Sequence, residues 1–268
     1  MRPTRTLATL ACTGLLFPAW AAQPATPVPP AATPAPTPTS LLRAADQELG
    51  WSTGVRYRVR VEAIGSVALD QRILDLEVRA RPTSDAWQFW IAGESLLPDG
   101  VTRRPIAITT DASATRVLEP DRRAVVEAIG ATGVTLLSEA SVMPAVFWIA
   151  AWERLVTEQM IDGGDGLTMR YAGARMAAGR LCDAVHVDYT KLDPQLGTLR
   201  DLWWFFDRET HLPVRIEACH FRRDQNAYGY QVLTITDLDA EATLTDEDMA
   251  LAVPPGFTVE TFELPALD

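Results

Sequence analysis

The chain has 268 residues, a formal net charge of −11 at pH 7, and 47% hydrophobic residues, which is ample for a buried core. Such an acidic chain lacks the clustered cations that neutralise phosphates, so its composition argues against binding nucleic acid or adhering to anionic lipid surfaces. At this length we expect one large domain or two small ones.

The first residues have the pattern of an export signal that a peptidase removes. Arg2 and Arg5 precede an apolar run that ends in Ala19-Trp20-Ala21, a small-x-small cleavage motif. The run is too short for the ~20 residues that span a bilayer, and no second long apolar segment follows. We therefore expect a signal peptide over residues 1–21, cleavage after Ala21 and a periplasmic location. Lipidation at Cys12 is the alternative.

Proline, alanine and threonine dominate residues 22–39, which predicts an extended, disordered linker. Proline fixes φ and removes backbone donors, so this stretch has no core of its own. Residues 40–268 are then expected to form a single α+β domain. Its first element is a predicted helix that Ser40 caps and Gly50 ends.

The pattern then changes to alternation of apolar and charged residues, which predicts strands with one face on a core. Residues 55–62 and 74–78 show this alternation most clearly. Further strands are predicted over residues 87–91, 106–110 and 115–118.

Two helices are predicted in the middle of the chain. The first begins at Asp121, carries apolar residues on one face up to Ile129, and stops at Gly130. The second begins near Pro144, which suits a first helical turn, and carries an apolar stripe. The members of this stripe are Trp148, Ile149, Trp152, Leu155, Val156 and Met160.

The last hundred residues return to strands separated by short turns, which predicts an antiparallel meander. The strands are expected at 167–173, 180–190, 199–207, 212–222 and 229–238, and a capped turn at 245–250 follows. The order of all elements predicts an α+β domain in which a curved sheet wraps an apolar helix.

The expected meander also places the two cysteines that remain after processing, Cys182 and Cys219. Asp207 then lies opposite Cys182, while Arg200 lies near the level of Cys219. The cysteines are therefore about 20 Å apart at ~3.3 Å per residue, whereas a disulfide needs Cα atoms within about 7 Å. We expect two unpaired thiols.

No catalytic, cofactor-binding or metal-binding motif is recognisable in the sequence. It has three histidines, none spaced with another as metal ligands, and it lacks Cys-x-x-Cys, a nucleophile elbow and a glycine-rich phosphate loop. A structural role is favoured for His186, and a helix end with a turn is favoured over a calcium site for residues 162–166. We expect a non-enzymatic protein with no cofactor and no metal.

Large aromatic residues give the positive signal. Residues 202–206 place apolar groups on both faces of one strand, and the central helix carries three aromatic residues that would lie beneath it. Two interpretations stay open: ordinary core packing of helix on sheet, or the wall of an apolar ligand cavity. The residues expected to line such a cavity are Phe147, Trp148, Trp152, Trp204 and Phe206.

A hairpin in the same region carries a family resemblance. Trp204-Phe205-Phe206-Asp207, Thr210 and residues 212–217 resemble the hairpin of periplasmic lipoprotein-carrier-like proteins, a superfamily that includes the LolA and LolB carriers and sensors of the sigma-E regulatory type. Asp248, Met249 and the Val-Pro-Pro-Gly-Phe run at 253–257 resemble the usual end of these chains.

This resemblance implies an α+β fold in which a curved antiparallel half-barrel sheet wraps and is closed by helices around an apolar cavity for acyl chains. The leading hypothesis is therefore a periplasmic monomer that binds a lipid or lipoprotein acyl chain. The alternative is an envelope sensor or protein-interaction module with the same fold and no ligand.

Overall fold

The computed structural model describes residues 35–49, 53–65, 73–84, 87–110, 114–129, 145–146, 148–149, 168–188, 199–222 and 227–263. The elements below all belong to the unit Pro36–Asp268. The expected signal peptide, Cys12, most of the linker and the turn at residues 162–166 lie outside the described residues.

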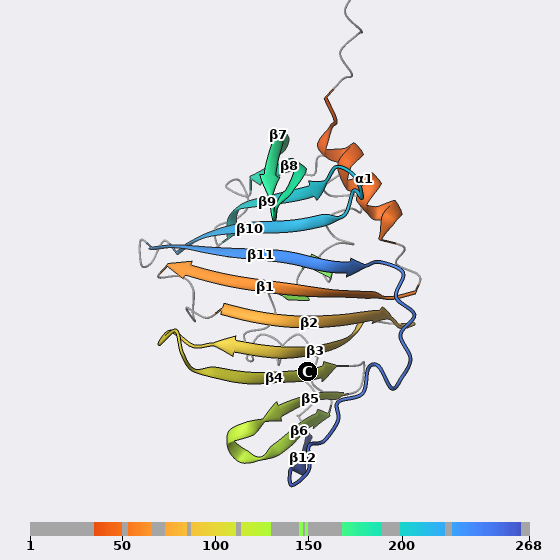
Figure 1. Ribbon diagram of the computed structural model, residues 1–268, viewed down its shortest axis with the longest axis vertical. Helices are drawn as coiled ribbons and strands as arrows, with labels where there is room; N and C mark the ends of the chain where they lie inside the picture. Colours follow the sequence, from red (N-terminus) through yellow and green to blue (C-terminus); the bar gives the residue numbers. More distant parts are fainter. Residues whose placement is uncertain are drawn as a thin grey trace, which may run out of the picture. The chain divides into compact units, whose positions relative to one another are not determined.

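One sheet of twelve strands dominates the fold, in the order β12-β6-β5-β4-β3-β2-β1-β11-β10-β9-β8-β7 (Figure 1). All neighbouring strands are antiparallel except β12 and β6, which are parallel. The strand bounds are β1 Val55–Gly65, β2 Ile73–Pro82, β3 Trp87–Leu96, β4 Arg103–Thr110, β5 Ala114–Glu119, β6 Ala124–Ile129, β7 Thr168–Ala177, β8 Arg180–Asp188, β9 Leu199–Asp207, β10 Pro213–Arg222, β11 Ala227–Asp239 and β12 Thr258–Glu263.

The sheet consists of two meanders that meet at its centre. Strands β1 to β6 follow one another in chain order on one side, and β7 to β11 do so on the other. The β1–β11 pair joins them, with Val59 opposite Ile235 and Val61 opposite Leu233. The antiparallel meander predicted for the last hundred residues is confirmed by the pairing of β7 to β11, and the sheet as a whole is antiparallel except at β12.

The predicted positions of the cysteines are also confirmed. Cys182 lies opposite Asp207, and Cys219 lies opposite Asp201, one residue from the expected level. A register irregularity between Pro213 and Arg215, nearer the turn, accounts for that shift. Both thiols are free.

The two faces of the sheet differ in polarity at its centre. On β1, Val55, Tyr57, Val59 and Val61 are at most 3% exposed, while the residues between them are charged and open to solvent. We call the face with these four residues the inner face and the opposite one the outer face. On the outer face, cross-strand ion pairs join Arg56 to Asp239, Arg58 to Asp237 and Arg60 to Asp75. Exposed pairs of this kind contribute little stability, so burial of the inner face drives folding.

Helix α1 (Pro38–Glu48) begins earlier than the sequence analysis predicts. Thr37, and not Ser40, is the N-cap: its side chain accepts from the Ser40 N–H while the Ser40 hydroxyl bonds the Thr37 backbone. Pro38 fits the first helical position because its missing N–H would have no partner there. The helix therefore starts within the predicted linker.

The helix predicted from Asp121 to Ile129 is wrong. Residues Pro120–Arg122 form a single 3₁₀ turn (η1), Arg123 adopts a left-handed conformation with φ 50°, and Ala124–Ile129 is strand β6. The apolar spacing of this segment fits a helix, but its β-branched residues also suit a strand. Pairing on both sides, with β5 and β12, decides between the two.

The chain returns from the centre of the sheet to its edge after β11. Figure 1 shows this segment, in dark blue, passing the ends of several strands before β12 joins β6. Two arginines of β2 hold it: Arg79 donates to the backbone oxygen of Asp248 at 2.8 Å, and Arg81 to that of Leu244 at 3.3 Å. Strand β12 was not predicted from the sequence.

The predicted central helix is described only in part. Ala145, Val146, Trp148 and Ile149 are helical, and the remaining predicted residues lie outside the described part of the chain. Within the described residues, α1 is the one α-helix with both ends defined, so the predicted closure of the sheet by helices is not part of the observed fold.

Asp207 organises the hairpin between β9 and β10. Its carboxylate accepts from the Glu209 N–H at 2.9 Å and from Arg180 of β8 at 2.6 Å. Burial by itself raises the pKa of Asp207, but these N–H groups and the positive charge of Arg180 outweigh burial, so the pKa lies below the ordinary 3.8. The carboxylate therefore stabilises the folded hairpin in its ionised form.

We predict that Asp207→Asn lowers the free energy of unfolding at pH 7 by about 1–3 kcal/mol, because it removes charge-assisted hydrogen bonds in a buried site. The stabilisation is fully present above the unfolded carboxyl pKa of about 3.9 and is lost as pH falls through the lower folded value. Urea unfolding at pH 7, 5, 4 and 3 measures the difference between the two proteins.

Asp121→Asn is the matched control, since the Asp121 side chain is 69% exposed in its pair with Arg104. We expect it to change stability little at any pH. Equal stability of wild type and Asp207→Asn at pH 7, or a gap that does not narrow in acid, would contradict the role given to Asp207.

Candidate functional site

The inner face of the sheet carries a continuous apolar surface. One cluster of buried side chains extends from β4, through the centre at β1 and β11, to β8. Its largest fully buried members include Trp148, Trp204, Tyr57 and Phe206. A sheet must cover an apolar face of this extent to remain folded in water, so the elements that lie on this face are needed for stability.

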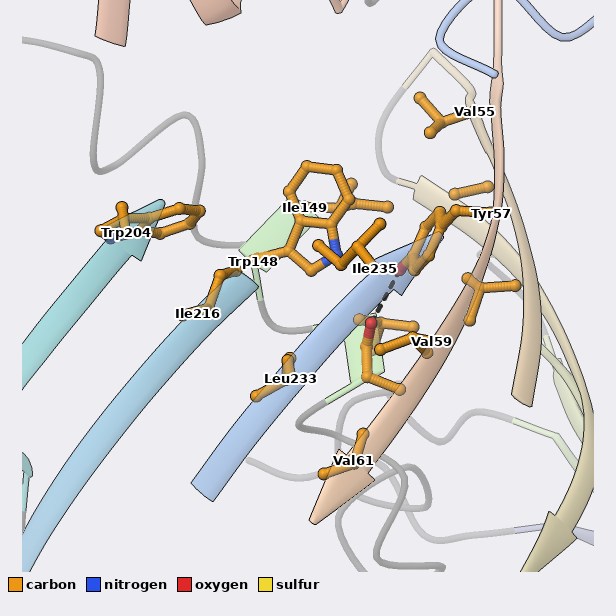
Figure 2. Close-up of a cluster of buried hydrophobic side chains, with 14 of the residues drawn as sticks. Val55, Tyr57, Val59, Val61, Trp148, Ile149, Trp204, Ile216, Leu233 and Ile235 are labelled. Carbon is orange, nitrogen blue, oxygen red and sulfur yellow. Dashed lines mark hydrogen bonds between the residues drawn. The ribbon is translucent and has the colours of Figure 1, made fainter. Parts of the chain in front are cut away.

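A short helical segment lies against the middle of this face, and its described residues are Ala145, Val146, Trp148 and Ile149. Figure 2 shows Trp148 and Ile149 among side chains of β1, β9, β10 and β11 that point toward them. The Tyr57 hydroxyl donates to the backbone oxygen of Ala145 at 2.7 Å. The rings of Tyr57 and Trp148 meet edge to face, with centroids 5.3 Å apart. This edge-to-face geometry is the favoured one for aromatic pairs.

Tyr57 is a neutral donor in this contact. Burial raises the pKa of its hydroxyl well above the ordinary 10.0, and the contact with Trp148 lowers it by less. The proton therefore stays on the oxygen at any physiological pH, and the bond to Ala145 ties the covering segment to β1.

Three of the five predicted cavity residues come together in this cluster. Trp148, Trp204 and Phe206 are each 1% exposed, and the rings of Trp204 and Phe206 stack at 6.0 Å on the inner face of β9. Phe147 and Trp152 lie outside the described residues. The three described aromatics are thus part of the buried core on the inner face.

Toward the margins the inner face is less covered. Several apolar side chains there are only partly buried while still packing on the central cluster. Those on the first meander are Trp87, Ile106 and Val117, and those on β7 are Met169 and Tyr171. These five side chains are not among the residues predicted to line a cavity. The alternation in the predicted strands 87–91, 106–110 and 115–118 nevertheless places Trp87, Ile106 and Val117 on the core side.

Both faces of β9 carry buried side chains. Phe205 is 5% exposed on the outer face, in a second small cluster with Ala184 and Val214. Beside it, the Trp203 ring lies 4.5 Å from the His186 ring and 4.8 Å from the Arg175 guanidinium.

His186 is held by hydrogen bonds on the outer face. Its Nδ1 accepts from Arg170 at 3.0 Å, and its Nε2 lies 2.6 Å from Asp201. Arginine can only donate, so the ring proton is on Nε2 and points to the Asp201 carboxylate. The contacts are those of a structural histidine, as predicted. The described residues hold no group of three side chains that could bind a metal ion.

Similar solved structures include two mycobacterial proteins. Lipoprotein LppX of Mycobacterium tuberculosis shares 15% identity over 75% of this chain and 93% of its own, with a TM-score of 0.44. LprF from Mycobacterium bovis shares 10% identity over 82% and 96%, with a TM-score of 0.45.

A LolA-superfamily protein from Nitrosomonas europaea is also similar, with 10% identity over 81% of this chain and 99% of its own and a TM-score of 0.31. No protein-family model matches the chain, and no curated protein matches its sequence. Among the described helices, none is long and apolar enough to cross a membrane.

We predict that Tyr57→Phe lowers the free energy of unfolding by about 1–2 kcal/mol, because it leaves the buried oxygen of Ala145 without its donor. Tyr228→Phe is the control, since Tyr228 is 57% exposed, and we expect it to change stability little. Urea unfolding followed by tryptophan fluorescence measures both. Equal effects of the two substitutions would show that the Tyr57 bond does not hold the covering segment.

Proposed function

We propose that this chain is a non-enzymatic periplasmic protein that binds an apolar ligand, a lipid or lipoprotein acyl chain, on the inner face of a half-barrel sheet. The single observation that supports this most is the continuity of the apolar inner face from β4 to β8. The described elements that pack on this surface are α1 and the helical residues Ala145, Val146, Trp148 and Ile149.

An acyl chain fits this surface for a physical reason. Each methylene moved out of water contributes about 0.8 kcal/mol, so a long chain gains much affinity without any specific polar contact. The partly buried side chains of Trp87, Ile106 and Val117 offer apolar area that is not fully used by the core. In the proposed fold, the cavity is completed by helices that close the half-barrel sheet, among them the helix predicted over residues 144–160.

The export signal and the proline-rich segment support the proposed location. A signal over residues 1–21 and a spacer after it would deliver the folded domain to the periplasm, where acylated envelope components occur. The resemblance of the β9–β10 hairpin to that of lipoprotein carriers points the same way.

A second candidate is an envelope sensor or interaction module with the same fold and no ligand. The observation in its favour is that Trp148, Trp204 and Phe206 are almost completely buried, so the centre of the face is filled by the chain's own side chains. Exposed apolar residues on the outer face, Tyr228, Tyr230 and Ile64, would then be available for contact with another protein.

We predict saturable binding of a fluorescent fatty-acid methyl ester to the purified protein, and about tenfold or more weaker binding to Ile106→Glu. The reason is that a carboxylate on the inner face must be desolvated by a bound acyl chain. Titration followed by probe fluorescence gives both dissociation constants.

Ala107→Glu is the matched control because Ala107 lies on the outer face of the same strand, opposite Ala92. We expect it to bind the probe as the wild type does, and far-ultraviolet circular dichroism checks that both variants are folded. A folded wild type that ignores the probe would rule out the ligand-binding function and favour the second candidate. If Ile106→Glu and Ala107→Glu weakened probe binding equally, the ligand would not be bound on the inner face at Ile106.

A further inference from the structure

The described part of the inner face contains buried hydroxyls that have no hydrogen-bond partner, and one of them is that of Thr115. Thr115 of β5 is 0% exposed, and its Oγ1 makes no hydrogen bond within the described structure. Burying a hydroxyl without a partner opposes folding, and native proteins satisfy nearly all such groups. A ligand with a suitable acceptor would satisfy this one.

Thr115 belongs to a buried row of side chains on the inner face. Alternation along β5 places it on the same face as Val117, which packs against the central cluster. Thr110 of β4 and Ala128 of β6 lie opposite it, and Phe89 lies opposite Thr110. These four residues form a row across β3, β4, β5 and β6, and each is at most 6% exposed. Within the row, only Thr110 and Thr115 have hydroxyl groups.

The row contains no charged residue. The nearest charged neighbours in sequence and register, Arg116 and Glu127, lie on the outer face, where they pair with each other at 2.6 Å. A ligand carboxylate at Thr115 would therefore be buried without a counter-charge, at a high desolvation cost. A neutral carbonyl oxygen has no such cost and still accepts a hydrogen bond.

We propose that the Thr115 hydroxyl donates to the carbonyl oxygen of a neutral acyl ester or amide linkage in the ligand. This inference rests on the proposed function, because it assigns a chemical class to the ligand of the same inner face. It makes the site selective for acylated lipids or acylated protein termini over alkyl chains that lack the carbonyl.

A second buried hydroxyl offers an internal control. Ser95 of β3 is also 0% exposed, and its Oγ also has no partner within the described residues. Ser95 lies opposite Leu74 and Arg104. It is six residues from Phe89 along β3, so the two residues are about 20 Å apart at ~3.3 Å per residue. A carbonyl bound at Thr115 is too far away to reach it.

The test compares a monoacylglycerol ester with the alkyl-ether glycerol of the same chain length, which differs by the absence of the carbonyl. Each compound displaces the fluorescent fatty-acid methyl ester from the full-length protein, from Thr115→Val and from Ser95→Ala. Because both compounds are compared within each protein, any change in affinity for the chain itself cancels.

We expect the wild type and Ser95→Ala to prefer the ester about tenfold, and Thr115→Val to lose that preference. We also expect a urea midpoint for free Thr115→Val no lower than that of the wild type, since the substitution removes an unsatisfied hydroxyl. Equal displacement by ester and ether in the wild type, or an unchanged preference in Thr115→Val, overturns the inference while the proposed function stands. Failure of the wild type to bind the probe overturns both.

Discussion

The pairing of β1 with β11 is the constraint on which the rest of the structure depends. Each meander is built from contacts between neighbours in sequence, whereas this pair joins residues from opposite ends of the domain. Val59 opposite Ile235 and Val61 opposite Leu233 align the apolar sides of both meanders. A slip of one residue would turn Thr234 toward the core in their place and divide the apolar surface in two.

The aligned inner face explains the arrangement of the remaining parts. Ion pairs keep the outer face of β1 and β2 in water, so the inner face is the side that must be covered. The Tyr57 hydroxyl binds the covering segment at the middle of that face through the backbone oxygen of Ala145. The aromatic residues Trp148, Trp204 and Phe206 are almost completely buried on the same face. The partly buried side chains of Trp87, Ile106 and Val117 lie on β3, β4 and β5, and the Thr115 hydroxyl, which has no partner in the described structure, lies on β5 as well. This distribution separates a structural centre from a flank that is suited to a ligand.

Local patterns in the sequence were sufficient to predict most strands and the register that sets Cys182 opposite Asp207. They were insufficient where distant pairing decides. Ala124–Ile129 has helical spacing, but it lies between β5 and β12, and β12 itself pairs with a strand far away in sequence. The sequence was also sufficient to predict that Trp148, Trp204 and Phe206 lie on the inner face, because of their size and their positions in the pattern. The role of Thr115 could not be predicted from the sequence, since a missing hydrogen-bond partner is a property of the folded surroundings.

The central claim is that the inner face holds an acylated ligand, and the most direct measurement is made on the protein from its own host cells. The full chain is purified without detergent, extracted with organic solvent, and the extract is analysed by mass spectrometry. The account predicts an acyl-ester or acyl-amide lipid in an amount comparable to the protein, and its depletion in Ile106→Glu but not in Ala107→Glu. A folded wild-type protein that yields no lipid would contradict it.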